Sequence, residues 1–518
     1  MKKIFILIVT VFLLAGALCV SAFAADTDAP AADPAKGVVL RISAEKSGKQ
    51  YPVVVADHTN FEDGWNAAMK LASDSKTLST NGYKHIIVDI YSDWKAVDGE
   101  FSDDIFNGKG FNWDTIYFPK NVEVTLNLNG HTVDRGLTAY QYNGEVMYVD
   151  AKARVTINNG TITGGWSCNG AGGIHVNDGA YVTLNNVNLI GNTAEDDDGA
   201  AIALYNGAHL TMNGGSMSNN VVYSTTFPYY IDLDGSRGVL YAKNSHVILK
   251  NVTFNGNVAK NGSIYGLVAY FVDSTAIMDN CVVENNGYVD TSKDKNYVSP
   301  LSLLFSTQDL DISIRNTVFK NNGSANRVVQ YGDASADHRQ TSLINLETHL
   351  RYNVAYAAFE NCTFTGNKMD YLFDIQNVEL IMKKCTVTDN QANVAYDRLA
   401  LSSAPVAKVI EKCTFNNNHP GKDIVYRALS TPGTFCFSSN KADVSFVDCD
   451  FGNSTFTNKN YAKFKNSSVV GSIFNEGSIV TIISIAALVS SVISITMTAV
   501  SNKKKKVAVT EKETNDKE

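Results

Sequence analysis

Three consecutive aspartates, Asp196, Asp197 and Asp198, form the densest group of carboxylates in the chain. They stand in an expected turn just before a strand, and His175 falls on the outward side of the corresponding strand one repeat earlier. Two carboxylates at a defined separation can hydrolyse a glycosidic bond. Alternatively, carboxylates can bind calcium while a basic residue beside them removes a proton from the substrate. The plainer interpretation is a solvated acidic turn, and the sequence favours it.

Five cysteines recur at one position of a repeat that is described below. Disulfides, a metal site or a buried column of small apolar side chains could explain them. Side chains about 4.8 Å apart that all face one way suit neither tetrahedral zinc nor a relaxed disulfide, so we expect a buried column. Cys168 and Cys436 stand elsewhere and could pair or stay free. The column consists of Cys281, Cys362, Cys385, Cys413 and Cys449.

Tyrosines and aspartates gather in three long excursions between repeats, at residues 223–238, 287–300 and 323–345. A tyrosine ring is flat and apolar with a polar tip, which suits stacking on a sugar or on another protein. Nearby carboxylates can accept hydrogen bonds from sugar hydroxyls. The alternative is that the rings pack the excursions onto the body of the protein. The candidate binding residues are Tyr223, Tyr229, Tyr230, Tyr288, Tyr297 and Tyr331.

A repeating unit must position these residues, because one motif recurs ten times along the chain. In every copy the residue three before a register position and the residue two after it are apolar. Asn or Gly precedes the register position in seven of the ten copies, and Asn follows five residues later in eight. The pattern predicts two short strands joined by a bend, then a turn with stacked asparagines. The register positions are 160, 187, 215, 252, 281, 317, 362, 385, 413 and 449.

Stacked in parallel, these units predict an all-β solenoid, a parallel β-helix of about ten or eleven coils over residues 122–454. Its first coil begins with the alternating segment 122–128. An open apolar end needs a cover, so we expect residues 37–121 to form an N-terminal cap with a short helix at 65–72. Residues 25–36 are interpreted as a linker. The spacing patterns of propeller blades and leucine-rich repeats are missing.

The two ends of the chain predict a secreted protein anchored in a membrane. Lys2 and Lys3, an apolar run and small residues up to Ala24 have the layout of a signal peptide, residues 1–24. Residues 479–500 carry no charge, are long enough to span a bilayer as a helix, and are followed by four lysines at 503–506. The lysines predict a cytoplasmic tail at 501–518 and an extracellular ectodomain, joined to the membrane by residues 455–478.

The net charge excludes one class of partner. The chain has 518 residues and a formal net charge of -8, with no basic stripe that could bind phosphates. Nucleic acid is therefore not expected as a partner. The predicted partners are an extracellular polysaccharide or another cell's surface.

Short motifs resemble two groups of β-helix proteins. Segments 170–176, 192–194 and 199–202 resemble the GGAI-type repeats of bacterial polymorphic surface proteins. Segment 128–133 is similar to the first coil of many pectate-lyase-like proteins. The resemblance covers about residues 122–454 and implies a right-handed parallel β-helix. It implies less about activity, because the superfamily includes polysaccharide lyases, glycoside hydrolases and adhesins.

The motifs of the enzymes in this superfamily are missing. The chain has nothing similar to the paired Asp, Gly-His-Gly and Arg-x-Lys set of polygalacturonases or to the basic cluster of the lyases, and His131 is interpreted as part of a turn. We therefore expect a surface adhesin that binds a glycan or another cell, with no cofactor, although calcium could bind the acidic turn. The alternatives are a membrane-tethered polysaccharide lyase or glycoside hydrolase and a structural spacer. An active site would bring carboxylates and a base from neighbouring coils into one groove.

Overall fold

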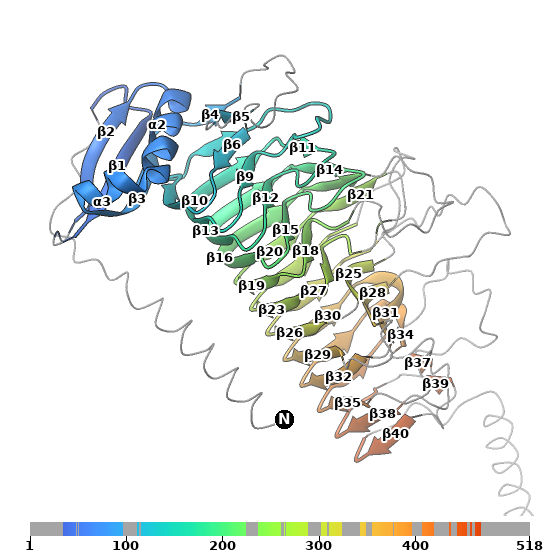
Figure 1. Ribbon diagram of the computed structural model, residues 1–518. Helices are drawn as coiled ribbons and strands as arrows, with labels where there is room; N and C mark the ends of the chain where they lie inside the picture. The colour runs from blue at the N-terminus through green and yellow to red at the C-terminus, as the bar shows by residue number, and fades with distance from the viewer. Residues whose placement is uncertain are drawn as a thin grey trace, which may run out of the picture.

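The computed structural model shows a long stack of short parallel strands with two helices at one end of the described chain (Figure 1). This arrangement confirms the all-β parallel solenoid that the repeat predicts. The residues that the structure describes are 35–47, 49, 51–96, 111–112, 115–223, 237–260, 264, 266–287, 302–307, 310–323, 342–348, 355–376, 378–395, 407–418, 435–436, 443–452, 456–457 and 462–467.

The largest sheet, called sheet A, contains the first strand of every coil. Within the described residues, thirteen strands follow one another in parallel register: β3 (Tyr83–Ile90), β7 (Glu123–Asn127), β10 (Arg154–Thr163), β13 (Tyr181–Ile190), β16 (His209–Ser218), β19 (His246–Lys250), β23 (Thr275–Asp279), β26 (Asp311–Arg315), β29 (Ala355–Glu360), β32 (Val378–Lys383), β35 (Ala407–Glu411), β38 (Asp443–Val447) and β40 (Ala462–Lys465). The stack thus extends one strand beyond each end of the predicted range 122–454.

The second strand of each coil follows the bend and also belongs to sheet A. In β10, β13 and β16 it is continuous with the first strand. Elsewhere it is separate: β4 (Trp94–Lys95), β8 (Thr132–Asp134), β20 (Thr253–Asn255), β24 (Val282–Glu284), β27 (Val318–Lys320), β30 (Thr363–Thr365), β33 (Thr386–Thr388) and β36 (Thr414–Asn416).

Two further sheets complete the coils. A four-stranded sheet, called sheet C, contains β11 (Trp166–Ser167), β14 (Thr193–Glu195), β17 (Val221–Tyr223) and β21 (Val258–Lys260). A thirteen-stranded sheet, called sheet B, contains β5 (Phe111–Asn112), β6 (Thr115–Phe118), β9 (Met147–Val149), β12 (Ile174–Val176), β15 (Ile202–Tyr205), β18 (Leu240–Lys243), β22 (Ala269–Val272), β25 (Ser302–Thr307), β28 (Ser342–Glu347), β31 (Lys368–Gln376), β34 (Gln391–Ala395), β37 (Phe435–Cys436) and β39 (Phe456–Thr457).

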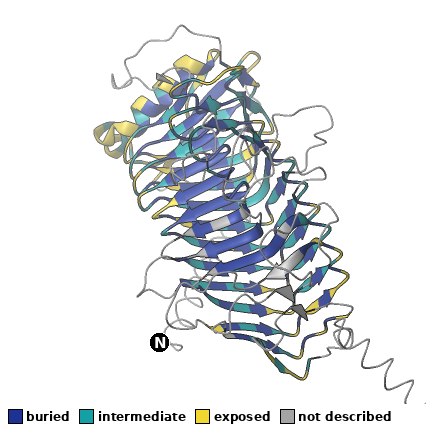
Figure 2. Cartoon of the chain, turned by 90° about the vertical axis from the view of Figure 1, so that its right-hand side faces the viewer, coloured by how far each residue is buried: buried dark blue, intermediate teal, exposed yellow. Residues whose placement is uncertain are grey.

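The interior of the stack is filled by the apolar positions of the repeat. Both apolar residues of every copy, such as Ile157 and Ile162, are at most 1% exposed. Figure 2 shows the strands of the stack as a continuous buried body. Burial of each such side chain stabilises the fold by roughly 1.5–3 kcal/mol. The apolar positions of the repeat therefore recur because every coil buries them in the core.

The bend between the two strands has a left-handed backbone in all ten copies, with φ between 51° and 70°. Seven copies place Asn or Gly there, as the repeat indicates, because these residues adopt this conformation at low cost. The other three place Lys384, Lys412 and Asp448 in the same conformation. The bend is therefore imposed by the stacking of the coils and not by its residue type alone.

The predicted asparagine ladder is present and buried. In Asn220 the backbone N–H and Nδ2 donate to Asn257 Oδ1 at 2.9 and 3.0 Å, and Nδ2 also donates to Leu189 O at 3.0 Å. The left-handed residue of this turn is the one before the ladder, such as Asn219, and not the ladder asparagine itself. The ladder satisfies buried backbone groups that would otherwise destabilise the turn.

The N-terminal end of the stack is covered by β1 (Leu40–Lys46), β2 (Val53–His58), α2 (Phe61–Ser73) and α3 (Ser75–Asn81). The residues expected to be helical, 65–72, lie within α2. Asn60 caps this helix by accepting a hydrogen bond from the Asp63 N–H at 2.9 Å. Trp65 is fully buried and its ring meets Phe118 edge-on at 5.0 Å, so α2 closes the apolar interior.

No helix within the residues that the structure describes is long and apolar enough to cross a membrane. The predicted signal peptide, residues 1–24, and the predicted span, residues 479–500, lie outside those residues.

Candidate functional site

The described ends of the three excursions lie at one corner of the coil, before a strand of sheet B. The first excursion follows β17 and returns to β18, the second follows Gly287 and returns to β25, and the third follows Gly323 and returns to β28. The strands β18, β22, β25 and β28 are successive neighbours in sheet B. The excursions therefore begin and end along one edge of the stack.

One of the six candidate tyrosines lies within the described residues. Tyr223 is half-buried at the end of β17, and the Lys260 ammonium lies 5.6 Å from the centre of its ring. The other five, which are Tyr229, Tyr230, Tyr288, Tyr297 and Tyr331, lie outside the described residues. Their role in binding stays a prediction.

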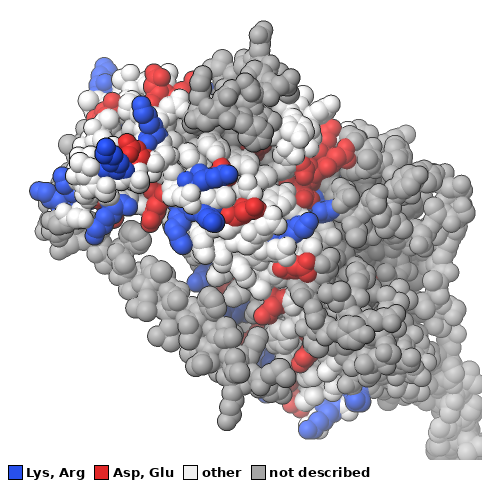
Figure 3. Space-filling view, in the orientation of Figure 1, with Lys and Arg blue, Asp and Glu red and all other residues white. Residues whose placement is uncertain are grey.

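The acidic turn connects β14 to β15 at the same corner. The Asp198 Oδ1 atom lies 3.6 Å from Arg237 Nη1, and the Tyr205 hydroxyl donates to Asp198 Oδ2 at 3.4 Å. Asp197 accepts hydrogen bonds from the backbone N–H groups of Gly170 and Asp198. Figure 3 shows acidic side chains gathered in this part of the surface, near β14, with basic side chains beside them.

Two of the three aspartates are enclosed by the protein. The Asp198 side chain is 13% exposed. Burial raises its pKa to about 7 although the Arg237 charge opposes the shift, and burial also raises the pKa of Asp197. Asp197 and Asp198 are therefore only partly solvated. Their oxygens are held by two backbone amides, a hydroxyl and a guanidinium of the chain itself.

His175 lies on the outward side of β12, as the sequence predicts, but it does not join the aspartates. Its ring is stacked between Tyr148 at 4.6 Å and Tyr205 at 5.0 Å. Burial lowers its pKa to about 4, so the ring is neutral at physiological pH. Among the described residues its Nδ1 atom has no hydrogen-bond partner. Tyr205 stands between this ring and Asp198.

The rings around His175 form a longer column, called the sheet-B stack. Successive ring centres are 4.6–5.8 Å apart. Because most of these rings face one another, their flat sides are taken by packing. The stack consists of Tyr117, Tyr148, His175, Tyr205, Tyr241 and Tyr270.

Glu145 and Arg237 belong to this region but were missed in the sequence. Glu145 is 3% exposed, and among the described residues its Oε2 atom has no hydrogen-bond partner. Burial raises its pKa to about 8, with Arg135 and Asp197 as its charged neighbours. Arg237 sits at the end of the first excursion, and β-pairing places it opposite Asp198. An alignment of the coils on the glycines that precede the sheet-B strands, such as Gly199 and Gly238, would have placed Asp198 beside Arg237.

Comparison with protein families identifies the first part of the repeating region. Residues 122–300 match the model of the family described as right handed beta helix region. This region is a right-handed parallel β-helix. No significant match was found among curated proteins or among solved structures.

The cysteine column lies inside the β-helix, as predicted. All five cysteines are at most 2% exposed, and none of them forms a disulfide. The Cys362 N–H donates to Cys385 Sγ at 3.5 Å, and the Cys385 N–H donates to Cys413 Sγ at 3.4 Å. Cys168, outside the column, is also a free thiol.

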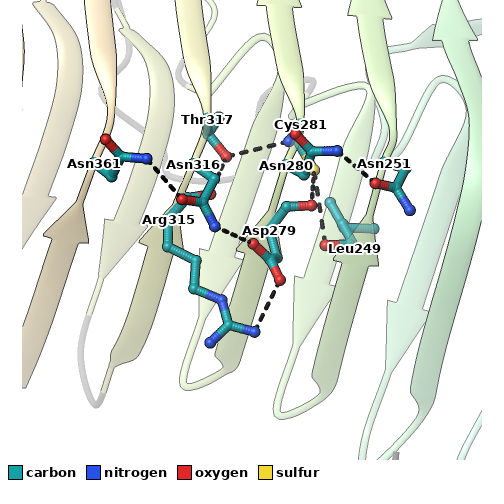
Figure 4. Close-up of polar contacts among 9 residues, drawn as sticks. All are labelled: Leu249, Asn251, Asp279, Asn280, Cys281, Arg315, Asn316, Thr317 and Asn361. Atoms are coloured by element: carbon teal, nitrogen blue, oxygen red, sulfur yellow. Dashed lines mark hydrogen bonds and ion pairs between the residues drawn. The ribbon is translucent and has the colours of Figure 1, made fainter. Parts of the chain in front are cut away.

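Figure 4 shows how the column begins at Cys281, whose N–H donates to Thr317 Oγ1 at 3.3 Å. Burial raises the pKa of Cys281 to about 11, so this thiol stays protonated. Outside the bend, Asn280 donates to Asn251 at 2.6 Å. Within the described part of the β-helix no three His, Cys, Asp or Glu side chains group closely enough to hold a metal ion.

Proposed function

We propose that this β-helix protein is a cell-surface adhesin, anchored by residues 479–500, that binds a glycan or another surface at the excursion corner. The observation that supports the proposal is the shared position of the excursions. Their described ends lie beside neighbouring strands of sheet B. Insertions at one edge of a solenoid can build a composite surface while the core stays intact.

The contacts of the acidic residues favour binding over catalysis. A catalytic carboxylate must reach the substrate, and a base must stand within hydrogen-bond distance of the proton that it removes. Asp198 is instead held by Arg237 and Tyr205, and the His175 ring is enclosed between two tyrosines. These groups stabilise the corner of the coil that carries the excursions.

A second candidate function is a polysaccharide lyase or glycoside hydrolase tethered to the membrane. It is favoured by the raised pKa values of Asp198, about 7, and Glu145, about 8, because a carboxyl that stays protonated near neutral pH can serve as a general acid. Incubation of the full-length protein with a polysaccharide panel, followed by measurement of new reducing ends and of unsaturated products, tests it. Turnover that is lost in Asp197→Ala and Asp198→Asn would favour the enzyme.

The adhesin is tested by shortening one excursion at a time in the full-length chain. Residues 224–236 are replaced by the sequence of residues 196–198, so that the connection from β17 to β18 becomes as long as the connection 196–201 one coil earlier and keeps Arg237. Adhesion of cells that display the protein to immobilised polysaccharides and to other cells is then measured. The matched control shortens residues 396–406, which lie between β34 and β35 at a different corner.

The proposal expects adhesion to fall in the excursion variant and to persist in the control, with equal display of both proteins. Equal adhesion of all variants, including those shortened at 288–300 and 324–341, would contradict it.

A further inference from the structure

A second row of stacked side chains runs along the outer face of sheet A and is called the sheet-A row. The Arg154 guanidinium lies 4.2 Å from the centre of the Tyr181 ring. That ring stacks on His209 at 4.2 Å, and His209 stacks on His246 at 4.6 Å. The four residues come from β10, β13, β16 and β19, which are consecutive strands. The row therefore presents one side chain per coil.

The sheet-A row is open to solvent. Tyr181 is 38% exposed, Arg154 and His246 are exposed, and His209 is half-buried. The other outward residues of β13 and β16 are uncharged: Thr183, Asn185, Thr211 and Asn213. The row thus lies on a flat polar surface that a polymer could approach.

The charges near the row are few. In register with it, Glu123 on β7 lies before Arg154, and Thr275 on β23 and Asp311 on β26 lie after His246. The next charged outward residue on the row's own strands is Lys250 on β19. Lys152, Asp178 and Asp273 stand in the turns before these strands, and Lys243 is the last residue of β18.

The state of the two imidazoles decides the charge of the row. Arg154 is always positively charged, and each of the two histidines adds a positive charge only when its imidazole is protonated. His246 Nδ1 lies 2.8 Å from Thr275 Oγ1, and the His246 residue is exposed to solvent. Burial and the charges of His246 and Arg154 lower the pKa of His209, so the full charge develops only in moderately acidic solution. Three cations on neighbouring coils then repel one another, and an anion beside them relieves the repulsion.

We propose that the sheet-A row binds an acidic polysaccharide, and binds it more tightly in mildly acidic solution than at neutral pH. The cations follow a straight line along the stack, separated by one or two coil steps of about 4.8 Å each. Such a line suits a linear polymer with evenly spaced sulfate or carboxylate groups better than the flat surface of a membrane. The row is separate from the excursion corner, so the inference goes beyond the proposed adhesin and does not depend on it.

The test measures binding of the full-length protein, purified in detergent, to dextran sulfate at about pH 5 and about pH 7.5 at constant ionic strength. Neutral dextran and anionic lipid vesicles are the comparison ligands. Two ion pairs gained at an exposed site predict binding of dextran sulfate roughly tenfold tighter at the lower pH. His209→Gln with His246→Gln is expected to remove this pH difference and leave the neutral binding unchanged.

The matched control is His131→Gln, which removes a half-buried histidine that instead contacts Asp93 at 3.2 Å. This control is expected to keep the full pH difference, and equal melting temperatures would show that all variants are folded. The inference is overturned if the native protein binds dextran sulfate equally at both pH values. A double variant that retains the difference, or vesicles that bind more tightly than dextran sulfate, would also overturn it. Adhesion at the excursion corner can succeed or fail independently.

Discussion

The sheet-B stack and the sheet-A row are built alike and lie in opposite environments. Both place outward rings on successive coils, and both contain histidine. In the sheet-B stack His175 is enclosed, with a pKa of about 4, beside buried carboxyls. In the sheet-A row the rings meet solvent on a surface of threonine and asparagine. One stacking geometry thus serves packing on one face and leaves a titratable, accessible row on the other.

The largest expected effect is on the pH dependence of stability, which a buried carboxyl near the sheet-B stack should change and an exposed one beside the sheet-A row should not. The pKa of Glu145 is raised from its ordinary value of 4.5 to about 8 in the folded protein. Its contribution is therefore fully favourable below about pH 4.5 and is lost as the pH rises toward 8. The unfolding free energy of the native protein should therefore fall by on the order of 3–4 kcal/mol across this pH window because of Glu145. In Glu145→Gln this part of the fall should be missing. Denaturant titrations of both proteins at several pH values measure it. The exposed Glu123 beside the sheet-A row, changed to Gln, is the control and should leave the profile almost unchanged.

The next effect compares the two arginines. Arg237 lies 5.6 and 5.7 Å from the ring centres of Tyr241 and Tyr270 and pairs with the buried Asp198. Arg237→Ala leaves that carboxyl without its cation, so a loss of roughly 2–3 kcal/mol is expected, less in acid where Asp198 is protonated. Arg154→Ala, on the exposed row, is expected to lose less than about 1 kcal/mol. Equal losses in urea unfolding would contradict the contrast between the faces.

A smaller effect compares the histidines. His175→Ala removes a ring from between two tyrosines and is expected to lower the unfolding free energy by about 2 kcal/mol near neutral pH. Because the pKa of His175 is depressed, its contribution is lost as the pH falls from 6.5 toward 4, and the difference between the two proteins shrinks there. His209→Ala on the exposed row should lose less than about 1 kcal/mol. A melting series over pH distinguishes these outcomes.

The coils themselves follow from the sequence because their interior is shared. Every coil buries the same two apolar positions, so hand-aligned register positions such as 160, 187 and 215 pair as neighbours in the structure. The asparagine turn is equally local, since each ladder residue bonds only to the coils beside it. The two apolar positions and the asparagine turn could therefore be predicted from a single sequence, because the same contacts recur in every coil.

The candidate site could be predicted only in part. The outward position of His175 follows from strand alternation, but the rings that enclose it come from other coils. Asp198 is paired with Arg237, which comes from the next coil. Arg237 follows an excursion whose length cannot be predicted from the repeat. Likewise β1 and β2 lack the repeat, so only the helix of the cap was anticipated. The unpredicted contacts are those made where the chain departs from its repeat.

The smallest expected effect lies inside the β-helix, between the two faces. Cys385→Val preserves a small apolar side chain, and valine already occupies this column at Val187 and Val252. Valine cannot accept the hydrogen bond that Cys362 N–H now donates to Cys385 Sγ, so a loss of about 1 kcal/mol is expected. Cys385→Thr should lose less, because Thr317 Oγ1 accepts the same hydrogen bond from the Cys281 N–H two coils earlier in the column.

Thiol labelling of the native protein completes this test. The column cysteines should resist an alkylating reagent until the protein is denatured, since burial excludes the reagent and, at Cys281, also raises the pKa of the thiol. The half-buried Cys168 provides the internal comparison and should react first. Rapid native labelling of Cys362, Cys385 or Cys413 would show that the coils open there. In that case the interior, and not only the sheet-A row, would be accessible from solvent.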